Sequence, residues 1–572
     1  MSEITGGELF AKCLASEGIE HVFGLPSPEI DPLFAQLEKY GIRLMPVRHE
    51  SAGVHMAEGL YKSTGKASCV IGNPGPGSAN LLPGIFTALH EGVPVLAITS
   101  QHRMGVSYPS PPSTFQGQDQ LDAFRPAVKW GGPIFEWDRI PEVLRLAFRE
   151  MWNGRPGPVH VDVPVTVMYD LGEESEQPIL APGAYRPSQP QASAAQIGAA
   201  ADLLESASRP IVVAGAGVDR AGANAQAAEL AELLGCPLIP TQAGRASVRS
   251  DHPNYVFGFG EGGIKARLEA DVILVAGSRI GNLDLPYDKY WGDPENQSLI
   301  QIDTDPSHLG VTRPLAIGMV ADAADALGGI TAELKRRDKT PSAEATAALA
   351  EAREADAAWQ AVQASTADDW EGEGIHPARA IEVIGETFGD QAIYTVDGGL
   401  TSVWAYAGLP PTPPRSYHSI LELGMLGTGI PSAIGSKIGC PDRDVVCVTG
   451  DGAAGFNIME MQSAARDSIP VTVIVFAEGS WTMEEPNELA LFNRTFGTEQ
   501  GETRWDLVAE GLGCHGEFVD QLGDLGEALV RCRDSGRPSV VCLKTNRDAN
   551  RVIPPAMAAR WMEVQAGPIP GV

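Results

Sequence analysis

Residues 444–481, DVVCVTGDGAAGFNIMEMQSAARDSIPVTVIVFAEGSW, predict a strand, a glycine turn, a helix and a second strand. Asp444–Thr449 is a short run of β-branched residues, which is typical of a buried strand, and Val471–Phe476 is a second such run. Between them, Gly450-Asp451-Gly452 breaks the first strand before apolar residues recur at helical spacing. A helix that begins after such a turn points its free N–H groups at an anion, and glycine lets the backbone approach that anion closely. A carboxylate in the turn can hold a divalent cation, so the pattern indicates a cradle for a metal-bound diphosphate.

Gly-Asp-Gly alone would also fit an ordinary β-turn, and only the longer pattern favours the cradle. The turn is followed by one helix, one strand and then Glu478-Gly479-Ser480-Trp481. This order resembles the thiamine-diphosphate signature of the enzyme family that includes acetolactate synthase, benzaldehyde lyase, benzoylformate decarboxylase and 2-hydroxyacyl-CoA lyase. In that family an Asn pair stands where this chain has Ala477-Glu478.

The resemblance implies a Mg²⁺ site within this stretch. By position the ligands are the side chains of Asp451 and Glu478 and the backbone carbonyl of Ser480, at the spacing usual in the family. A glutamate oxygen can bind Mg²⁺, but it adds a negative charge beside the diphosphate, which an Asn would not. Glu478 is therefore the position at which this site departs from the family pattern.

Two glycine-rich segments upstream complete the cofactor site that the resemblance implies. Ala392–Val396 is a strand run that leads into a glycine turn, and LGMLGTGIPSAIG at 423–435 resembles LGTMGFGLPAAIG of acetolactate synthase. There Leu426 takes the place of the bulky apolar residue that bends the cofactor, and Gly424 offers its carbonyl to the cofactor's amino group. A packed glycine-rich turn is the alternative for this segment. The expected cofactor-binding residues are Gly399, Leu400, Thr401, Gly424, Leu426, Gly450, Gly452, Ala453 and Trp481.

Glu50 is the expected proton-transfer residue. It closes the strand run RLMPVRHE, and on position alone a solvated carboxylate at a strand end would be the simpler interpretation. However, RHE followed by SAGVHMAEGLYKSTG resembles the family segment that carries the essential glutamate. There the carboxyl hydrogen-bonds a ring nitrogen of the cofactor's aminopyrimidine and so makes the amino group a base. Ser51 is expected to cap the helix that follows, Ser51–Ser63.

Three further polar residues are candidates for contact with the substrate. Glu29 stands where benzaldehyde lyase has a His, Gln116 matches the family's Phe-Gln, and Glu484, with its neighbour Glu485 as a further candidate, lies where relatives place a substrate-facing helix. Each also has a simpler interpretation. Glu29 and Glu484 can be carboxylates at helix starts, where the helix dipole favours them, and Gln116 can be a loop amide without catalytic duty.

Composition excludes several classes of function. The 572 residues carry a net charge of −31 with a pI of about 4.7, so the surface repels nucleic acid and anionic membranes. No apolar run approaches the roughly 20 residues of a membrane span, and the N-terminus lacks a signal-peptide pattern. The eight cysteines are scattered without a C-x-x-C pair, which indicates reduced thiols in the cytoplasm rather than structural zinc or disulfides.

The length suits about three domains, and strand and helix patterns alternate through most of the chain. This predicts an α/β fold with three doubly wound parallel-sheet domains. A Pro- and Glu-rich linker is expected at 165–195, and an Ala/Glu-rich surface helix at 341–370. The expected units are an N-terminal pyrimidine-binding domain (1–185), a central Rossmann-like domain (196–340), a C-terminal diphosphate- and Mg²⁺-binding domain (370–545) and a tail (546–572) that is either a lid or a loose terminus.

The central domain is expected to bind no cofactor. GAGVDRAG at 215–222 lacks the G-x-G-x-x-G spacing of a dinucleotide site. Some members of the family bind FAD, ADP or CoA in this domain, so FAD is not expected but is compatible with the resemblance.

The resemblance covers nearly the whole chain and implies cofactor chemistry held in place by protein. The expected enzyme is a carboligase or lyase of the acetolactate synthase and benzaldehyde lyase kind, acting on a 2-oxo acid or an acyloin. Two alternatives remain open: an enzyme like 2-hydroxyacyl-CoA lyase or oxalyl-CoA decarboxylase, and a non-catalytic homologue, which Glu478 motivates. In the family the domain that carries Glu50 pairs with the diphosphate domain of another chain. A homodimer or homotetramer with a small-molecule substrate is therefore implied, without a nucleic-acid or membrane partner.

Overall fold

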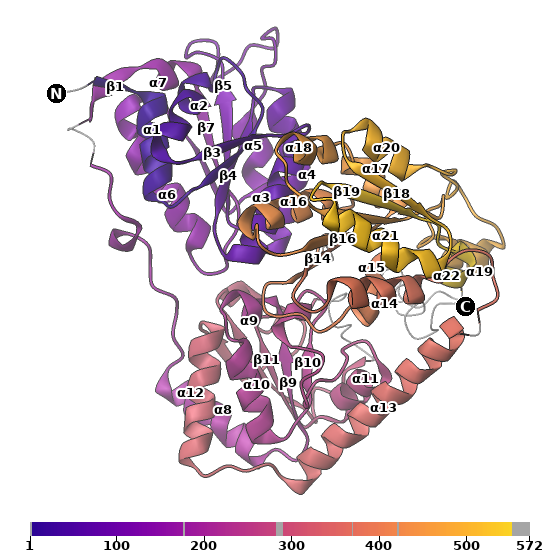
Figure 1. Ribbon diagram of the computed structural model, residues 1–572. Coiled ribbons are helices and arrows are strands. Elements are labelled where there is room, and N and C mark those ends of the chain that lie inside the picture. The colour runs from indigo at the N-terminus through magenta and orange to yellow at the C-terminus, as the bar shows by residue number, and fades with distance from the viewer. Residues whose placement is uncertain (1–2, 175–177, 282–289, 369, 420–421, 552–572) are drawn as a thin grey trace.

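Three parallel β-sheets, one after another along the chain, form the framework of the protein (Figure 1). The computed structural model describes residues 3–174, 178–281, 290–368, 370–419 and 422–551. Helices pack around each sheet, as expected where consecutive parallel strands are joined by helical crossovers. The expected α/β fold with three doubly wound parallel sheets is confirmed. Within the described residues no helix is long and apolar enough to cross a bilayer.

The N-terminal sheet has six parallel strands in the order β3-β2-β4-β5-β7-β6. Its central strands are fully buried, which explains why they are continuous apolar runs rather than alternating patterns. The strands are β2 (His21–Gly24), β3 (Arg43–Pro46), β4 (Ser68–Gly72), β5 (Val95–Gln101), β6 (Trp130–Pro133) and β7 (Val159–Pro164). The helices of this body are α1 (Gly6–Ser16), α2 (Asp31–Leu37), α3 (Glu50–Thr64), α4 (Pro76–Glu91), α5 (Gln120–Phe124), α6 (Ile140–Trp152) and α7 (Val165–Tyr169).

The segment expected to be a linker begins with regular structure. β8 (Leu171–Glu173) pairs antiparallel with β1 (Glu3–Thr5) and so closes the N-terminal body. After a short gap in the described residues, the chain runs through a 3-10 turn (Pro182–Ala184) to the central body (Figure 1).

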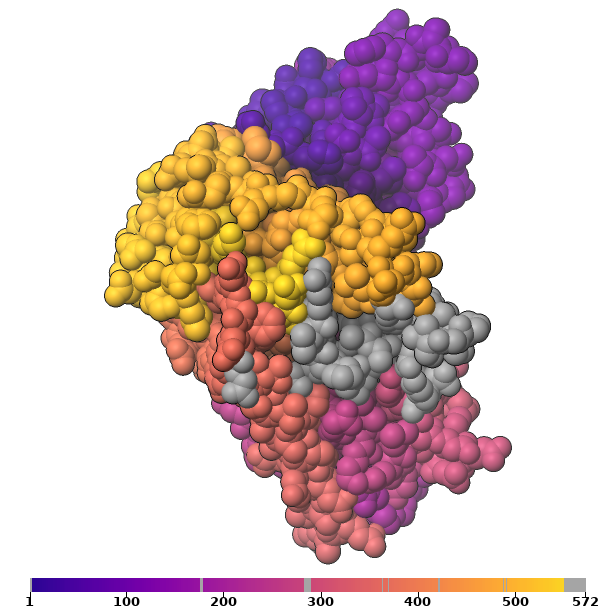
Figure 2. All heavy atoms as spheres, turned by 90° about the vertical axis from the view of Figure 1, so that its right-hand side faces the viewer, coloured from indigo at the N-terminus to yellow at the C-terminus, as the bar shows by residue number. Residues whose placement is uncertain are grey.

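The central sheet has five parallel strands in the order β10-β9-β11-β12-β13. They are β9 (Pro210–Ala214), β10 (Leu238–Pro240), β11 (Val272–Ala276), β12 (Ser298–Asp303) and β13 (Ile317–Val320). Its helices are α8 (Ala194–Ser206), α9 (Ala216–Arg220), α10 (Asn224–Leu234), α11 (Glu261–Glu269) and α12 (Ala323–Arg336). The expected Ala/Glu-rich helix is α13 (Ala343–Asp368), which extends from the central body towards the C-terminal body (Figure 1 and Figure 2).

The C-terminal sheet has six parallel strands in the order β15-β14-β16-β17-β19-β18. Numbered within its own body, this is the same order as in the N-terminal sheet. The strands are β14 (Ile393–Val396), β15 (Tyr417–His418), β16 (Val445–Gly450), β17 (Thr472–Phe476), β18 (His515–Val519) and β19 (Ser539–Leu543). The helices are α14 (Pro377–Phe388), α15 (Leu400–Gly408), α16 (Gly429–Gly439), α17 (Asp451–Asn457), α18 (Glu460–Arg466), α19 (Glu485–Phe492), α20 (Trp505–Gly511), α21 (Leu522–Asp534) and α22 (Arg547–Arg551). Beyond Arg551 the expected tail lies outside the described residues.

Two local expectations about helices are wrong. The single helix expected after the glycine turn is two helices, α17 and α18, because Met461 N bonds to Ile458 O and interrupts the regular ladder. The cap of α3 is His49 rather than Ser51. His49 has extended backbone and its Nδ1 accepts a bond from Ser51 N, so Ser51 already lies in the first turn.

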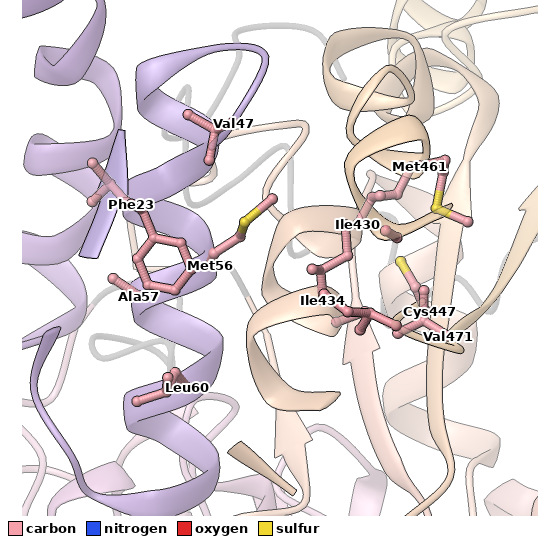
Figure 3. Close-up of a cluster of buried hydrophobic side chains, with 14 of the residues drawn as sticks. Phe23, Val47, Met56, Ala57, Leu60, Ile430, Ile434, Cys447, Met461 and Val471 are labelled. Carbon is pink, nitrogen blue, oxygen red and sulfur yellow. The ribbon is translucent and has the colours of Figure 1, made fainter. Parts of the chain in front are cut away.

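Helices α3 and α16 join the N- and C-terminal bodies through a reciprocal backbone contact. A Cβ on Gly59 would lie 1.9 Å from Ser432 O, and a Cβ on Gly435 would lie 1.9 Å from Met56 O. Only glycine permits this approach at either position. Around it, apolar side chains of both bodies form one continuous core, part of which is drawn in Figure 3.

A buried charged group lies near the carboxyl end of α3. Lys62 Nζ is 2.6 Å from Glu58 Oε1 and 3.0 Å from Glu91 Oε2, and all three side chains are largely buried. Burial opposes ionisation of Glu58, but the charge of Lys62 outweighs it and lowers the pKa of Glu58 to about 2. Arg415 donates to the carbonyls of Tyr61 and Lys62, so a residue of the C-terminal body caps this helix end.

Candidate functional site

The C-terminal sheet reverses its strand order between β14 and β16, and open α/β sheets bind ligands at the carboxyl ends of such strands. Gly398, just after β14, has a φ of +95°, which favours glycine. A Cβ there would lie 3.1 Å from Gly450 N, at the end of β16. A Cβ on Gly452 would lie 2.3 Å from the ring of Trp481. The turn at 398–399 and the turn at 450–452 therefore form a surface of bare backbone, which we call the glycine floor. The indole ring of Trp481 borders it.

Asp451 is buried at the first position of α17 and organises this floor. Its Oδ1 accepts a hydrogen bond from Gly452 N (2.8 Å), and its Oδ2 accepts bonds from Glu478 N (2.9 Å) and Gly479 N (2.5 Å). Burial raises the pKa of this carboxyl, and the backbone donors oppose the shift. Because each carboxylate oxygen has two acceptor sites, Oδ1 retains one for a cation.

Glu478 follows β17, and two hydroxyl groups hold its side chain. Its Oε2 accepts a bond from Thr482 Oγ1 (2.6 Å), and its Oε1 accepts one from Thr545 Oγ1 (3.1 Å). Its backbone N–H donates to Asp451, so the two expected metal ligands are adjacent. The carboxylate of Glu478 is thus held by a neutral hydroxyl donor at each oxygen.

Ser480 is buried two residues further on, and its hydroxyl donates to Glu485 Oε1 (2.6 Å). Glu485 is fully buried and also pairs with Arg547, at 3.3 Å. Glu484, the expected substrate-facing residue, is exposed at the cap position of α19. Of the two neighbouring carboxylates, the structure therefore buries Glu485 and leaves Glu484 in contact with solvent.

The loop before α16 lies against the end of α17. Asn457 Nδ2 donates to Gly427 O (2.8 Å), and the Cβ of Phe456 lies where a side chain on Gly427 would have to go. Gly424 has a φ of +73° and is exposed, and Leu426 is half-buried. The loop that borders the glycine floor thus carries both the expected carbonyl acceptor, Gly424, and the expected apolar wedge, Leu426.

Asp397 holds this loop to the floor and was not among the expected site residues. Its Oδ1 accepts a bond from Gly398 N (2.7 Å) and its Oδ2 accepts one from Gly429 N (2.7 Å). Burial raises its pKa to about 6, against the effect of these backbone donors. The expected residues beside it, Gly399, Leu400 and Thr401, form the start of α15, and Ala453 is buried in the first turn of α17.

Glu50 opens α3 at the carboxyl edge of the N-terminal sheet and is 6% exposed. Its Oε2 accepts a hydrogen bond from Asn80 Nδ2 (3.0 Å). Its Oε1 lies 3.2 Å from the place that a Cβ on Gly77 would occupy, so the glycine at the start of α4 leaves room for the carboxyl. Asn80 is a further site residue that the sequence did not indicate.

Glu29 and Gln116 lie on loops at the same edge as Glu50. Glu29 Oε1 is 4.0 Å from His102 Nδ1, and His102 Nε2 is 2.6 Å from Phe115 O. Gln116 has a φ of +56° and packs on the turn of Gly75, where an added Cβ would lie 2.8 Å from its own Cβ. One histidine thus links the two loops that carry Glu29 and Gln116.

The expected residues fall into two groups, one at each terminal sheet. Glu29, Glu50 and Gln116 lie at the N-terminal edge, and the metal and cofactor residues lie at the C-terminal edge. Among the residues that the structure describes, no hydrogen bond or ion pair joins Glu50 to the 450–452 turn of the same chain.

Three domain models of thiamine pyrophosphate enzymes match the chain: the N-terminal binding domain at 4–123, the central domain at 197–330 and the C-terminal binding domain at 397–543. A sulfoacetaldehyde acetyltransferase of Alcaligenes xylosoxydans is 30% identical, covering 96% of this chain and 94% of that protein. The chain belongs to the thiamine pyrophosphate enzyme family. A probable acetolactate synthase large subunit of Methanocaldococcus jannaschii is also 30% identical (96% and 93% covered), and that of Haemophilus influenzae is 31% identical (83% and 82%).

The residues of the C-terminal edge fit thiamine diphosphate. Side chains at Gly398, Gly450 or Gly452 would narrow the floor on which a diphosphate must rest. Two helices, α15 and α17, begin at this floor without a side-chain cap, so their amino ends would present a favourable dipole to an anion bound there. Asp451 has an acceptor site to spare and would be a suitable oxygen ligand for a divalent cation.

Proposed function

We propose that this protein is a thiamine-diphosphate- and Mg²⁺-dependent enzyme that makes or breaks a carbon–carbon bond next to the carbonyl of a 2-oxo acid or an acyloin. The observation that carries the proposal is the buried carboxyl of Glu50, held by Asn80 at the edge of the N-terminal sheet. A homologue that only bound the cofactor would have no use for an acid in this place. The proposed reaction type is that of a carboligase or lyase similar to acetolactate synthase.

In this proposal the C-terminal edge holds the cofactor. The amino ends of α15 and α17 bind the diphosphate, and Asp451, Glu478 and the carbonyl of Ser480 bind Mg²⁺. Leu426 supports the bend between the two rings, and Trp481 covers Gly452. When bound, thiamine diphosphate supplies the carbon nucleophile and the electron sink that cleavage beside a carbonyl needs.

Glu50 has the proton-transfer role in this proposal. Its carboxyl would hydrogen-bond a ring nitrogen of the aminopyrimidine and exchange a proton there. Asn80 keeps the carboxyl in its orientation through Oε2, which leaves Oε1 for the ring. Glu29, Gln116 and Glu484 are proposed to face the substrate, and Glu29 would do so with His102 beside it.

We further propose that two chains complete each active site, as a homodimer or homotetramer. Glu50 and Asp451 lie at different edges of one chain, so Glu50 would serve the cofactor of a neighbour. Apolar side chains face solvent at both edges: Phe115 is 78% exposed, and Phe456 and Met459 are 59% and 45% exposed. Burying these side chains against a second copy would remove apolar surface from water.

The relatives favour a second candidate. Several are named sulfoacetaldehyde acetyltransferase, at 28–30% identity over most of this chain. On this alternative the substrate would be sulfoacetaldehyde: its carbon–sulfur bond would break with release of sulfite, and the remaining two carbons would pass as an acetyl group to a nucleophilic acceptor. The proposed location for either reaction is the cytoplasm, which agrees with all eight cysteines being free.

The test is turnover of the purified protein with Mg²⁺ and thiamine diphosphate on a panel of pyruvate, acetoin, benzoin, sulfoacetaldehyde and a 2-hydroxyacyl-CoA. Product from pyruvate, acetoin or benzoin supports the first candidate, and product from sulfoacetaldehyde supports the second. Turnover of the CoA thioester, with saturable inhibition by free CoA, would replace both candidates with an acyl-CoA lyase. Absence of turnover on the whole panel, together with no binding of thiamine diphosphate, would overturn the proposal.

A further inference from the structure

Glu460 is a buried carboxylate that the site described above does not use. It is the first residue of α18 in the C-terminal body and is 1% exposed. Its Oε1 accepts hydrogen bonds from the backbone N–H groups of Arg48 (2.8 Å) and His49 (3.0 Å) in the N-terminal body. Its Oε2 accepts a bond from Ser463 Oγ (2.8 Å). A carboxylate of one body thus fixes the main chain of another.

These bonds act on the residues immediately before Glu50. In a capping box, a glutamate of the helix's own first turn bonds the N–H of the cap residue. Here the cap residue of α3 is His49, and the glutamate that bonds its N–H is Glu460, supplied by α18. The start of α3, and with it Glu50, therefore depends on a different body of the protein.

Other contacts from α18 reach the same segment. Arg466 Nη2 donates to Pro46 O (2.6 Å), and Arg48 Nη1 donates to Gln462 Oε1 (3.2 Å). These groups are exposed, and exposed polar contacts contribute little to stability. The side chain of Glu460, in contrast, is buried. Removing its carboxylate from water costs free energy unless the carboxylate accepts hydrogen bonds within the protein.

A carboxylate at the start of a helix is often no more than a partner of the helix dipole. Such a partner works from the surface and needs no bond to another part of the chain. The burial of Glu460 and its two bonds across the junction go beyond that role. Because α18 directly follows α17, Glu460 also links the glycine floor of this chain to the helix that carries Glu50.

We propose that Glu460 is a positioning residue for Glu50. By holding the N–H groups of Arg48 and His49, it fixes the start of α3. The Glu50 carboxyl would then lie at hydrogen-bond distance from the ring nitrogen of the cofactor's aminopyrimidine. This inference rests on the proposed function, which gives Glu50 its proton-transfer task. A misplacement of about 1 Å can cost a rate about a hundredfold.

The experiment compares Glu460→Ala, Glu460→Gln and the control Gln462→Ala by amide hydrogen exchange and by turnover. Exchange is measured on peptides that cover residues 46–53, in protein without added cofactor. Glu460→Ala removes the acceptor, so exchange there should rise at least about tenfold. Its turnover should fall about ten- to a hundredfold, while the KM for thiamine diphosphate is unchanged because Asp451 is untouched. Glu460→Gln keeps an acceptor oxygen and should recover most of both properties, and Gln462→Ala should behave as the unmodified protein.

Unchanged exchange and turnover in Glu460→Ala would overturn the inference, as would a lower melting temperature with unchanged turnover. Should the alanine variant fail to fold, Glu460→Asp takes its place, because its shorter side chain cannot reach both N–H groups. Faster exchange and slower turnover are then expected, and unmodified values of both would overturn the inference. Failure of the proposed function is a separate outcome: Glu50→Gln would then retain turnover, whatever the exchange at 46–53.

Discussion

The N- and C-terminal sheets have the same strand order but present different chemistry at their carboxyl edges. At the N-terminal edge, side chains are prominent: Glu29, Glu50, Asn80 and Gln116. At the C-terminal edge, glycine turns and helix amino ends form the surface, and Asp451 is the principal acid held within it. One architecture thus presents two chemically different edges.

This difference follows from what each edge would have to do. A diphosphate is large and strongly charged, so it is best met by several fixed backbone N–H groups and a cation. A proton must pass to and from one atom, so one well-held carboxyl is enough. We therefore expect changes at the N-terminal edge to impair turnover, and changes at the C-terminal edge to impair cofactor binding.

The strongest test of this comparison is Glu50→Gln. Loss of the exchangeable proton should lower turnover about 10²- to 10⁴-fold, the usual worth of a general acid or base. Because the glutamine can still accept from Asn80, the fold and the affinity for thiamine diphosphate should be unchanged. Calorimetric titration with the cofactor and circular dichroism are the controls. Loss of cofactor binding in this variant would show that the two edges are not divided in the way described.

A second test concerns the carboxyl end of α3. Buried charged side chains lie there, whereas the buried residues of α16 are uncharged. Lys62→Met leaves Glu58 and Glu91 buried without their cation, which should cost about 3–5 kcal/mol near pH 7. In the unmodified protein the lowered pKa of Glu58 contributes stability that is complete above about pH 4.5 and is lost as the pH falls towards 2. In the variant the orphaned carboxyls can be protonated, so its deficit should shrink between pH 7 and pH 5.

Thermal melts at both pH values measure this deficit. Lys66→Met is the matched control, because Lys66 pairs with Glu20 at the surface, and it should change stability by no more than about 1 kcal/mol. Equal melting temperatures for Lys62→Met and the unmodified protein at pH 7 would show that the buried group contributes nothing to the junction.

At the other edge, Asp451→Asn should weaken cofactor binding rather than proton transfer. The amide removes the charge that a divalent cation needs and places an NH₂ group where an oxygen accepts from the backbone. We expect the affinity for thiamine diphosphate with Mg²⁺ to fall at least about ten- to a hundredfold. Quenching of tryptophan fluorescence provides the assay, since Trp481 lies on Gly452. Binding as tight as in the unmodified protein would remove Asp451 from the metal site.

The smallest effect is expected for substitutions at the junction of α3 and α16, which test whether the N- and C-terminal bodies contribute equally to it. Gly59→Ala and Gly435→Ala each drive a Cβ to 1.9 Å from a carbonyl oxygen, and each should cost about 1–3 kcal/mol. If the junction is reciprocal, the two costs should be similar. Gly198→Ala is the control: it lies in α8 with open space around it and should be neutral or stabilising by up to about 1 kcal/mol. A large difference between the melting temperatures of Gly59→Ala and Gly435→Ala would mean that the Gly59–Ser432 and Gly435–Met56 contacts are not energetically equivalent.

The sequence predicted those parts of the fold whose signal is local. The apolar runs at 444–449 and 471–476 became β16 and β17, because buried parallel strands need no polar face. The glycine turn between them lies at the end of β16, where a Cβ on Gly452 would lie 2.3 Å from the ring of Trp481. Short edge strands such as β15, with two residues, have too little pattern to be recognised.

The site was harder to predict where its residues act through distant partners. Asp397, Asn80 and Glu460 are ordinary polar residues in the sequence, and each owes its role to a group far along the chain. The cap of α3 is a similar case. Ser51 has the better capping propensity, yet His49 takes the position, where Glu460 holds its N–H.

The reciprocal contact of Gly59 and Gly435 gives the chain the internal geometry of a homodimer joined into one polypeptide. In a true homodimer every substitution appears on both sides of the axis at once. Here each half mutates independently while the shared junction stays intact. A substitution at one carboxyl edge therefore leaves the other edge unchanged, so acids and amides can stand at one edge while glycines stand at the other.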